Sequence, residues 1–492
     1  MADGSWRGAT PGSSDPRDRA AATGAYTGTR GGRGDRDDEK SFVNTSEVGP
    51  PRLEISPWIE APADLRPPLA GDRTADVVIV GAGYTGLSTA LALKRAGVEV
   101  VVLERDFAGF GASGRNAGHL TPTIGKDLPT LLLLFGEART CELVRFAEAS
   151  VDTVEALIRG HGIDCDYQPC GNIMAAVHPK QEARLRRASE AAARVGAHVH
   201  FLDRAEMRRR RMPATFLAGA WEERGGTLDP GRYVNGLRRA ALDAGVVLHE
   251  QTAVLEIVEG PRPRVRTAMG SVRADAVVLA TNAYTVELQR LKSTTFPLHD
   301  TLFESAPLSA SQREELGWPG SEGIYTAHES LESYRFTSRG TIVGGSKGVR
   351  YPYASALTGD STSWTISENV RGFRERFPTL AGVPVAHTWG GWIAMTLNFL
   401  PAVGVTGSHG NIHYALGYNG HGIAAASAMG PIVADAVLGR PNPILGQFRR
   451  FPVPLPPEPL RWLLVRGLLG VLNTVDRRLD AQLRRGAATS VP

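Results

Sequence analysis

Three glycines and one acidic residue near residue 80 have the types and spacing of a nucleotide-binding turn. The stretch Gly81-Ala-Gly-Tyr-Thr-Gly86 fits the pattern G-x-G-x-x-G. In this pattern the first glycine permits a tight turn, the second lets a pyrophosphate approach the backbone, and the third lets a helix pack closely on a strand. Glu104 follows Gly86 at close to the roughly 20 residues expected of an acid that binds a ribose hydroxyl pair. The residues predict a dinucleotide site whose carboxylate would repel the 2′-phosphate of NADP, and the motif leaves FAD and NAD open.

The elements around this turn are predicted to be a strand, a helix and a second strand. Asp76–Val80 is a short β-branched run of the kind that is buried in a parallel sheet. A helix from about Thr85 to Ala96 would point its positive N-terminal end at the phosphates. Val98–Leu103 is the second strand, and Glu104 lies at its carboxyl end. Because all these parts occur in the required order, they favour a dinucleotide site over an ordinary strand-to-helix turn.

Composition and charge restrict the classes of function. The chain of 492 residues is 42% hydrophobic and 22% charged, and its net charge of +4 gives no case for binding nucleic acid. Its three cysteines (Cys141, Cys165 and Cys170) are an odd, sparse set that fits a reducing compartment, and their spacing does not indicate a zinc site. No apolar stretch approaches the ~20 residues needed to span a bilayer, and no secretory signal is evident. We therefore expect a cytoplasmic protein without a metal site.

The two ends of the chain differ from the middle. Residues 1–55 are rich in Gly, Ser, Arg and Asp, so we expect a disordered tail that buries too little surface to offset the entropy of ordering. Leu460–Leu479 is apolar and basic, within a C-terminal helical extension over residues 441–492. A helix packed on the protein body or on another subunit is preferred there over contact with a membrane surface, which is the alternative.

Four later stretches are rich in small residues or glycine, which suggests backbone lying against a flat ligand or a phosphate chain. They are Phe107–Leu120, Ala274–Ala283, Thr388–Asn398 and Ile412–Gly422. The last of these reads as a strand, a glycine loop and the start of a helix from about Ile423 to Leu438, so a second helix N-terminus would face the ligand. Thr388–Asn398 and Ile412–Gly422 are expected to return the chain to the first domain.

Together these motifs resemble the FAD-dependent amine and amino-acid oxidoreductases of the D-amino-acid oxidase superfamily. GASGRN, followed late in the chain by GYNGHG, most resembles the gamma-glutamylputrescine oxidase branch. The resemblance runs from about Ala75 to Arg440 and selects FAD over NAD. It implies an α/β fold, with a Rossmann-like FAD-binding domain of glutathione-reductase type and an α+β substrate domain built on an antiparallel sheet. The implied FAD-binding domain comprises residues 75–160, 215–295 and 385–440, and the substrate domain comprises residues 161–214 and 296–384.

The resemblance also implies contacts to FAD along most of the chain. The glycines of the first turn would bind the pyrophosphate, Glu104 and Arg105 the adenosine ribose, and Val254 would lie by the adenine. The full implied set is Gly81, Gly83, Tyr84, Thr85, Gly86, Glu104, Arg105, Gly111, Ala112, Ser113, Gly114, Arg115, Asn116, Val254, Ala280, Thr281, Asn282, Gly420, His421 and Gly422. Branches that tether FAD to a cysteine use one in the carboxyl-terminal half. This chain has none after Cys170, so FAD is expected to be held without a covalent bond.

The implied reaction oxidises a primary or secondary amine that resembles gamma-glutamylputrescine or an amino acid. A hydride would pass from the α-carbon to flavin N5, the imine would hydrolyse, and O2 would reoxidise the flavin and form H2O2. One alternative is an amino-acid dehydrogenase that passes electrons to a quinone or carrier, with Leu460–Leu479 as its membrane contact. Another is a flavin-binding protein without turnover. The sequence leaves the oligomeric state open.

Five residues are candidates for the chemistry, each with a structural alternative. His421 could orient the flavin or assist amine deprotonation, because the pKa of histidine is near neutral. Lys347 could promote reduction of O2, and Trp389 could border the flavin or the substrate. Tyr334 and Arg335 could contact the substrate, but adjacent strand residues face opposite ways, so one of the two is expected to do so. The alternatives are a solvated lysine, a structural histidine and core packing.

Overall fold

Two large β-sheets form the frame of the protein, and one of them carries the predicted nucleotide-binding turn. The computed structural model describes residues 50–489 apart from 321, 359–360 and 450–452. The expected disordered tail, residues 1–55, falls almost entirely outside the described residues.

The first sheet has six strands. In spatial order these are β19 (Ala402–Thr406), β20 (Ile412–Leu416), β13 (Ala276–Leu279), β2 (Val77–Val80), β3 (Val100–Leu103) and β9 (Val247–His249). All neighbours are parallel except β19 and β20, which are antiparallel. Within β2, Val77 and Ile79 pack on one side of the sheet, whereas Val78 and Val80 pack on the other. Burial on both faces explains why the strand reads as an unbroken β-branched run.

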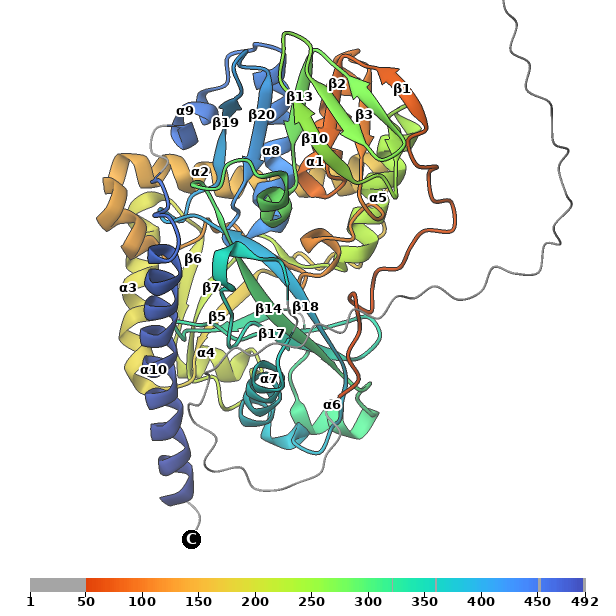
Figure 1. Ribbon diagram of the computed structural model, residues 1–492. Helices are drawn as coiled ribbons and strands as arrows, with labels where there is room; N and C mark the ends of the chain where they lie inside the picture. Colours follow the sequence, from red (N-terminus) through yellow and green to blue (C-terminus); the bar gives the residue numbers. More distant parts are fainter. Residues whose placement is uncertain (1–49, 321, 359–360, 450–452, 490–492) are drawn as a thin grey trace, which may run out of the picture. The chain divides into compact units, whose positions relative to one another are not determined.

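Helices cover one face of this sheet and a smaller sheet covers the other (Figure 1). The covering helices are α1 (Tyr84–Arg95), α2 (Leu128–His161), α5 (Pro230–Asp243), α8 (Gly422–Val437) and α9 (Pro443–Arg449). The smaller sheet contains β1 (Gly71–Thr74), β12 (Gly270–Arg273), β11 (Arg264–Thr267) and β10 (Val254–Val258). The helix α2 bends at Gly136, whose φ of 75° interrupts the helical conformation. These layers position the carboxyl ends of β2, β3 and β13 at one edge.

The second large sheet has eight strands and is mostly antiparallel. In spatial order they are β18 (Val385–Met395), β14 (Phe296–Ser305), β17 (Ile342–Gly345), β16 (Ser333–Phe336), β15 (Gly323–Thr326), β5 (Asn172–Ala176), β7 (Ala218–Glu222) and β6 (Val199–Leu202). Only the β15–β5 pair is parallel among these described strands. The remaining helices are α3 (Pro179–Val195), α4 (Arg204–Arg209), α6 (Ala310–Leu316), α7 (Ser363–Arg376) and α10 (Leu460–Thr489), and the short strands β4 (His119–Leu120) and β8 (Gly226–Thr227) pair with each other.

Two strands from the segments expected in the nucleotide-binding domain lie in the second sheet. The strand β18 is within the expected segment 385–440, and β7 is within the expected segment 215–295. Both belong to the eight-stranded sheet. For β18 the reason is its long antiparallel pairing with β14, from Phe296 opposite Met395 to Ser305 opposite Val385. The Trp389 motif suggests a position close to the ligand, but a residue close to the ligand can come from either sheet.

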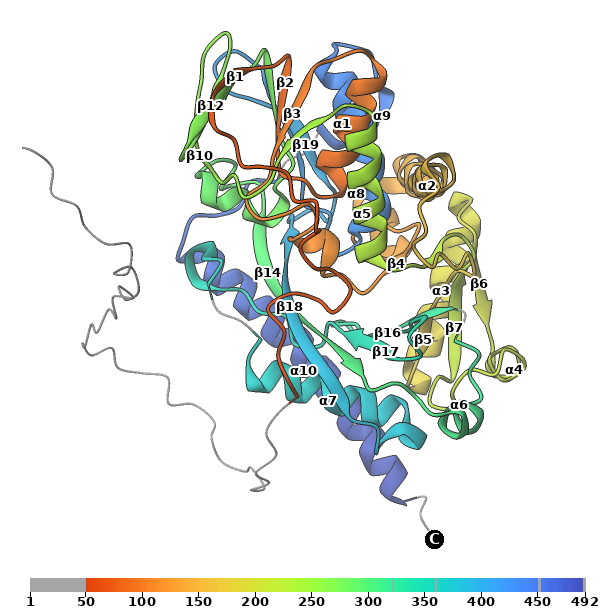
Figure 2. The ribbon, with the colours of Figure 1, turned by 90° about the vertical axis from the view of Figure 1, so that its right-hand side faces the viewer.

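The C-terminal helix α10 packs beside α7 on the helical side of the second sheet (Figures 1 and 2). Leu479 and Leu483 join the apolar core there, and Arg484 donates to Glu375 of α7 at 2.8 Å. The helix α10 has 30 residues, but neither it nor any other helix within the described residues is both long and apolar enough to cross a bilayer.

Candidate active site

A cavity of about 930 Å³ lies where the carboxyl ends of β2, β3 and β13 approach the eight-stranded sheet. Most residues predicted to contact a dinucleotide line it. They are Gly81, Gly83, Tyr84, Thr85, Glu104, Arg105, Gly111, Ala112, Ser113, Arg115, Asn116, Val254, Ala280, Thr281, Asn282, Gly420, His421 and Gly422. Gly86 and Gly114 lie behind this wall, in close packing with neighbouring backbone. Residues far apart in sequence therefore meet in one place.

The first glycine turn has the close approaches that its pattern predicts. Gly81 has a φ of 102°, which side chains rarely adopt, and a Cβ on Gly86 would lie 1.9 Å from the Gly81 carbonyl oxygen. A Cβ on Gly83 would lie 2.8 Å from Oγ of Ser113. No side chain caps the N-terminus of α1, and its first turn has no acidic residue. The backbone therefore leaves room for a pyrophosphate at a helix end whose dipole favours an anion.

Glu104 is held beside this turn by backbone hydrogen bonds. Its Oε2 accepts from the N–H of Ala82 at 2.7 Å, and its Oε1 accepts from the N–H of Asp106 at 3.1 Å. Burial raises the pKa of Glu104 above its usual value, against the effect of these two donors. The carboxyl group is fixed at the end of β3, where its remaining lone pairs can accept from ribose hydroxyls.

The loop after β3 is rigid because its own side chains bind its backbone. Oγ of Ser113 accepts from the N–H of Tyr84 at 3.0 Å, and the Tyr84 hydroxyl donates to the Ser113 carbonyl at 2.6 Å. Asn116 donates to the Ser113 carbonyl at 2.9 Å. Arg115 donates to the Phe110 carbonyl at 2.7 Å, and its guanidinium lies 4.5 Å from the centre of the Phe110 ring. These contacts present a preformed surface to a ligand.

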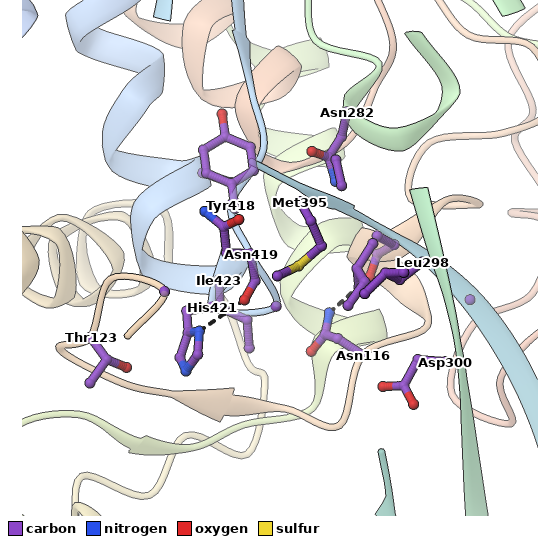
Figure 3. Close-up of a pocket in the computed structure, with 18 of the residues that line it drawn as sticks. Asn116, Thr123, Asn282, Leu298, Asp300, Met395, Tyr418, Asn419, His421 and Ile423 are labelled. Carbon is purple, nitrogen blue, oxygen red and sulfur yellow. Dashed lines mark hydrogen bonds between the residues drawn. The ribbon is translucent and has the colours of Figure 1, made fainter. Parts of the chain in front are cut away.

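A second helix N-terminus reaches the cavity at α8, as the sequence predicts. No side chain caps this helix and no acidic residue lies in its first turn. His421 precedes it, and its Nδ1 donates to the Asn419 carbonyl at 3.1 Å (Figure 3). Burial and the charge of Lys126 lower the pKa of His421, against the opposite effect of that hydrogen bond. Tyr418 and Thr85 join α8 to α1 through a 2.7 Å hydrogen bond between their hydroxyls.

The opposite wall comes from β14, and it contains a carboxylate that the sequence did not single out. Leu298, Asp300 and Leu302 alternate along the strand and line the cavity. One oxygen of Asp300 accepts from the Thr301 N–H at 2.7 Å, and the other accepts from the Ser346 hydroxyl at 2.8 Å. Burial raises the pKa of Asp300 to about 6 despite these donors. Figure 3 shows Asp300 on the same side of the cavity as Asn116.

A second carboxyl group in this wall, that of Glu222, is hydrogen-bonded to a tyrosine. Glu222 of β7 accepts from the hydroxyl of Tyr325, and burial raises the pKa of Glu222 to about 7. His119 packs edge-on to the Tyr325 ring, with ring centres 5.8 Å apart, and burial lowers the pKa of His119 to about 4. Glu222 is therefore hydrogen-bonded to a tyrosine of the same sheet, whereas Asp300 accepts from a backbone N–H and a serine hydroxyl.

Of the five candidates for the chemistry, His421 lines the cavity and the other four do not. Lys347 is buried in ion pairs with Glu332 and Asp480, at 2.5 and 2.7 Å, so its charge is neutralised away from the cavity. The indole N–H of Trp389 donates to the Arg115 carbonyl at 2.9 Å, so Trp389 supports the loop from behind. Neither Lys347 nor Trp389 is among the residues that line the cavity.

Tyr334 and Arg335 do face opposite ways, but neither reaches the cavity. Tyr334 is buried in the apolar core and its hydroxyl donates to Glu332 at 3.2 Å. Arg335 points toward the first domain, where its guanidinium donates to the Ala117 carbonyl and lies 5.3 Å from the Trp58 ring. The loop that contains Ala117 covers Arg335, so this guanidinium holds the loop in place.

One cluster of described residues has the spacing of a metal site. His328, Glu332 and Asp480 place possible ligand atoms within 4.8 Å of one another. Arg376 contacts the same two carboxylates, at 2.8 Å from Glu332 and 2.7 Å from Asp480, and Lys347 contacts both as well. Two cations thus balance two anions, and the cluster is an ion-pair network.

Comparison with known proteins identifies the class. The sequence model of the DAO family, FAD dependent oxidoreductase, matches residues 76–436. The chain belongs to this family, and it is an FAD-dependent oxidoreductase. The gamma-glutamylputrescine oxidoreductase of Escherichia coli (strain K12) is 31% identical over 369 residues, which cover 74% of this chain and 84% of the relative. A probable oxidoreductase OrdL of Haemophilus influenzae is 29% identical over 384 residues, which cover 76% and 85%.

Solved structures support the same fold. Glycine oxidase from Geobacillus kaustophilus has a TM-score of 0.65 at 20% identity, over 75% of this chain and 96% of that one. L-proline dehydrogenase from P. horikoshii also has a TM-score of 0.65 at 20% identity, over 80% and 99%. The cofactor is FAD, and the residues described above fit it: two uncapped helix ends, the glycine approaches and Glu104 lie along one cavity.

Proposed function

We propose that the protein oxidises a primary or secondary amine that is bound as a cation beside Asp300. The observation that carries this proposal is the environment of that carboxylate. Asp300 lines the cavity between Leu298 and Leu302, and both of its hydrogen bonds come from neutral donors. Within the described residues no lysine or arginine forms an ion pair with it. A carboxylate in the cavity wall without a cation from the protein is complementary to a cationic ligand.

The same group can prepare the amine for oxidation. An amine must be neutral before its α-carbon loses a hydride, and an ammonium ion must therefore transfer one proton. Asp300, with a pKa raised to about 6, can hold that proton at a carboxyl oxygen when the ammonium is adjacent. When bound, FAD would supply the redox chemistry, as acceptor of the hydride and donor of electrons to O2 with H2O2 as product, and the imine would hydrolyse in water.

Other residues of the cavity would bind the cofactor and orient it. The N-terminal N–H groups of α1 and α8 favour anionic or electron-rich atoms of the cofactor. His421 is anchored to the Asn419 carbonyl, so we propose that it positions the flavin edge. Leu298, Leu302 and Trp392 contribute apolar side chains to the cavity wall.

The cavity also has a cation for a carboxylate at the far end of a long substrate. Lys126 lines it and lies 5.2 Å from the centre of the Phe399 ring. Thr123, which is in the same loop, is on the side of the cavity away from Asp300 (Figure 3). By contrast, the guanidinium of Arg184 is already paired with Asp127 and Glu329, at 3.0 and 2.7 Å. A carboxylate remote from the amine, as in gamma-glutamylputrescine, fits this arrangement.

An amine panel tests the proposal. The purified protein loaded with FAD is mixed without oxygen with putrescine, gamma-glutamylputrescine, glycine, proline and sarcosine, and loss of the visible flavin absorbance is recorded. We expect gamma-glutamylated amines to bleach the flavin fastest, and air to restore the colour with formation of H2O2. Bleaching by amino acids alone, or restoration by a quinone but not by air, would instead support an amino-acid dehydrogenase. No bleaching by any amine would overturn the proposal.

A further inference from the structure

The C-terminal helix α10 has an apolar stripe of solvent-exposed side chains. Six large apolar side chains along it are between 49% and 62% exposed: Leu460, Leu463, Leu464, Leu468, Val471 and Val475. Exposed apolar side chains that are scattered singly need no explanation, but a continuous stripe on one helix indicates a surface that contacts something.

The stripe cannot rotate inward, because the opposite side of α10 is fixed to the body. Val465 is buried with Phe296 and Leu298. Asp476 accepts from the N–H groups of Glu329 and Ser330, at 2.9 and 2.8 Å. Asp480 is part of the buried ion-pair network described above. The helix therefore packs on the body, as preferred from the sequence, and still presents an apolar face.

The charges on the exposed side are all of one sign. Between residues 460 and 485 the exposed charged side chains are arginines: Arg466, Arg477, Arg478, Arg484 and Arg485. The two acids of this segment, Asp476 and Asp480, are buried. A second copy of the helix would place arginines against arginines, whereas an anionic surface would attract all of them.

Aromatic groups lie at the N-terminal end of the stripe. Trp462 and Tyr353 pack edge to face with ring centres 6.1 Å apart, and Tyr353 is 57% exposed. Arg466 lies 4.8 Å from the Trp462 ring centre. Leucine, tryptophan and arginine in this arrangement are typical of helices that lie in the interface of a bilayer.

We propose that α10 binds the surface of an anionic lipid bilayer, with its axis in the plane of the interface and its arginines against the headgroups. The helix lies on the membrane and does not cross it. Leu464 and Leu468 belong to the stripe and also line the large cavity. Membrane contact therefore brings lipid to the border of the active-site cavity.

Vesicle sedimentation tests this inference without relying on turnover, so its failure is distinguishable from failure of the proposed amine oxidation. The protein loaded with FAD is centrifuged with vesicles of phosphatidylcholine, alone or mixed with phosphatidylglycerol. We expect binding to the mixed vesicles, at least tenfold weaker binding to the neutral ones, and further weakening by salt.

Two double variants and one control locate the surface. L463S/V471S removes apolar area outside the cavity wall, and R466E/R478E reverses charge, so each is expected to lower binding to the mixed vesicles at least tenfold. L133S changes a leucine on α2 that is 86% exposed and is expected to leave binding unchanged. Retained FAD colour shows that each variant is folded. Absent or charge-independent binding would overturn the inference, as would a dimer in analytical ultracentrifugation that L463S/V471S dissociates.

Discussion

Nζ of Lys347 lies 2.7 Å from a carboxylate oxygen of Asp480, although the two residues are 133 positions apart in the sequence. The contact joins the end of β17 to the C-terminal helix α10. Glu332 and Arg376 complete the network, and all four side chains are buried. Because the helix also borders the cavity, the network fixes one wall of the active site to the core of the second sheet.

Replacing Asp480 by Asn is expected to destabilise the protein strongly. The change leaves two buried cations facing one carboxylate, and breaking a buried pair in this way costs about 3–5 kcal/mol. Denaturant unfolding measures the loss. R478Q, on the exposed side of the same helix, is the control and should change the free energy of unfolding by less than about 0.5 kcal/mol. Equal stability of D480N and R478Q would contradict the role of the network.

Acid should weaken the same network. The pKa of Glu332 is lowered to about 2, because the charges of Arg376 and Lys347 outweigh the opposing effect of burial, and the pKa of Asp480 is also well below its usual value. A carboxyl group with a lowered folded pKa stabilises the protein above its unfolded pKa of about 4, and that stability is lost as the pH falls toward the folded pKa. The stability of the wild type should fall more steeply than that of D480N from pH about 4 to about 2.

Asp300→Asn is expected to raise KM for an amine at least tenfold and to lower kcat, because the ammonium loses its ionic partner and the proton its acceptor. In the wild type, kcat/KM should decrease as the pH falls below about 6, where Asp300 becomes protonated. The D300N variant should not show this decrease of kcat/KM at low pH. S346A removes one hydrogen bond to the same carboxylate and should shift the decrease to higher pH. An unchanged decrease in D300N would remove Asp300 from the mechanism.

The same substitution should stabilise the protein at neutral pH. Asp300 has a folded pKa of about 6, above the unfolded value of about 4. Folding therefore takes up a proton between these pH values, and the carboxyl group lowers the stability as the pH rises through that window. D300N avoids the charged form and is expected to gain up to about 3 kcal/mol above pH 6, at about 1.4 kcal/mol per pKa unit. Thermal unfolding at pH 5 and pH 7 checks the sign, since the gain should be larger at pH 7.

Gly83→Ala is expected to weaken FAD binding at least tenfold. The new Cβ would lie 2.8 Å from Oγ of Ser113 and would occupy the approach of the pyrophosphate. Titration of apoprotein with FAD, followed by flavin fluorescence, measures the affinity. G467A is the control, because its Cβ would meet nothing within 4 Å. Release of unmodified FAD by acid from the wild type would agree with non-covalent binding, since Cys141, Cys165 and Cys170 do not line the cavity.

The nucleotide-binding half could be predicted because its residue types have roles that the local backbone determines. Gly86 must lack a Cβ because the carbonyl of Gly81 lies against it, and such a requirement can be recognised as a glycine pattern in a short stretch of sequence. Asp300 belongs to no such pattern, since the sequence of an alternating strand is the same whether its carboxylate faces solvent or a cavity. The ion pair of Lys347 could not be read from the sequence, because its partner Asp480 comes from a helix far along the chain. The position of Arg335 could not be read either, because the loop that contains Ala117 covers it.

The helices α1 and α8 touch at backbone distance, since a Cβ on Gly430 would lie 2.4 Å from Cβ of Ser88 and 2.7 Å from the nitrogen of Thr89. The Thr85–Tyr418 hydrogen bond joins the same pair nearer the ligand. The two helix N-termini that line the cavity are therefore held at a fixed separation. A methyl group added at Gly430, where the helices touch, is expected to change that separation and with it the shape of the cavity.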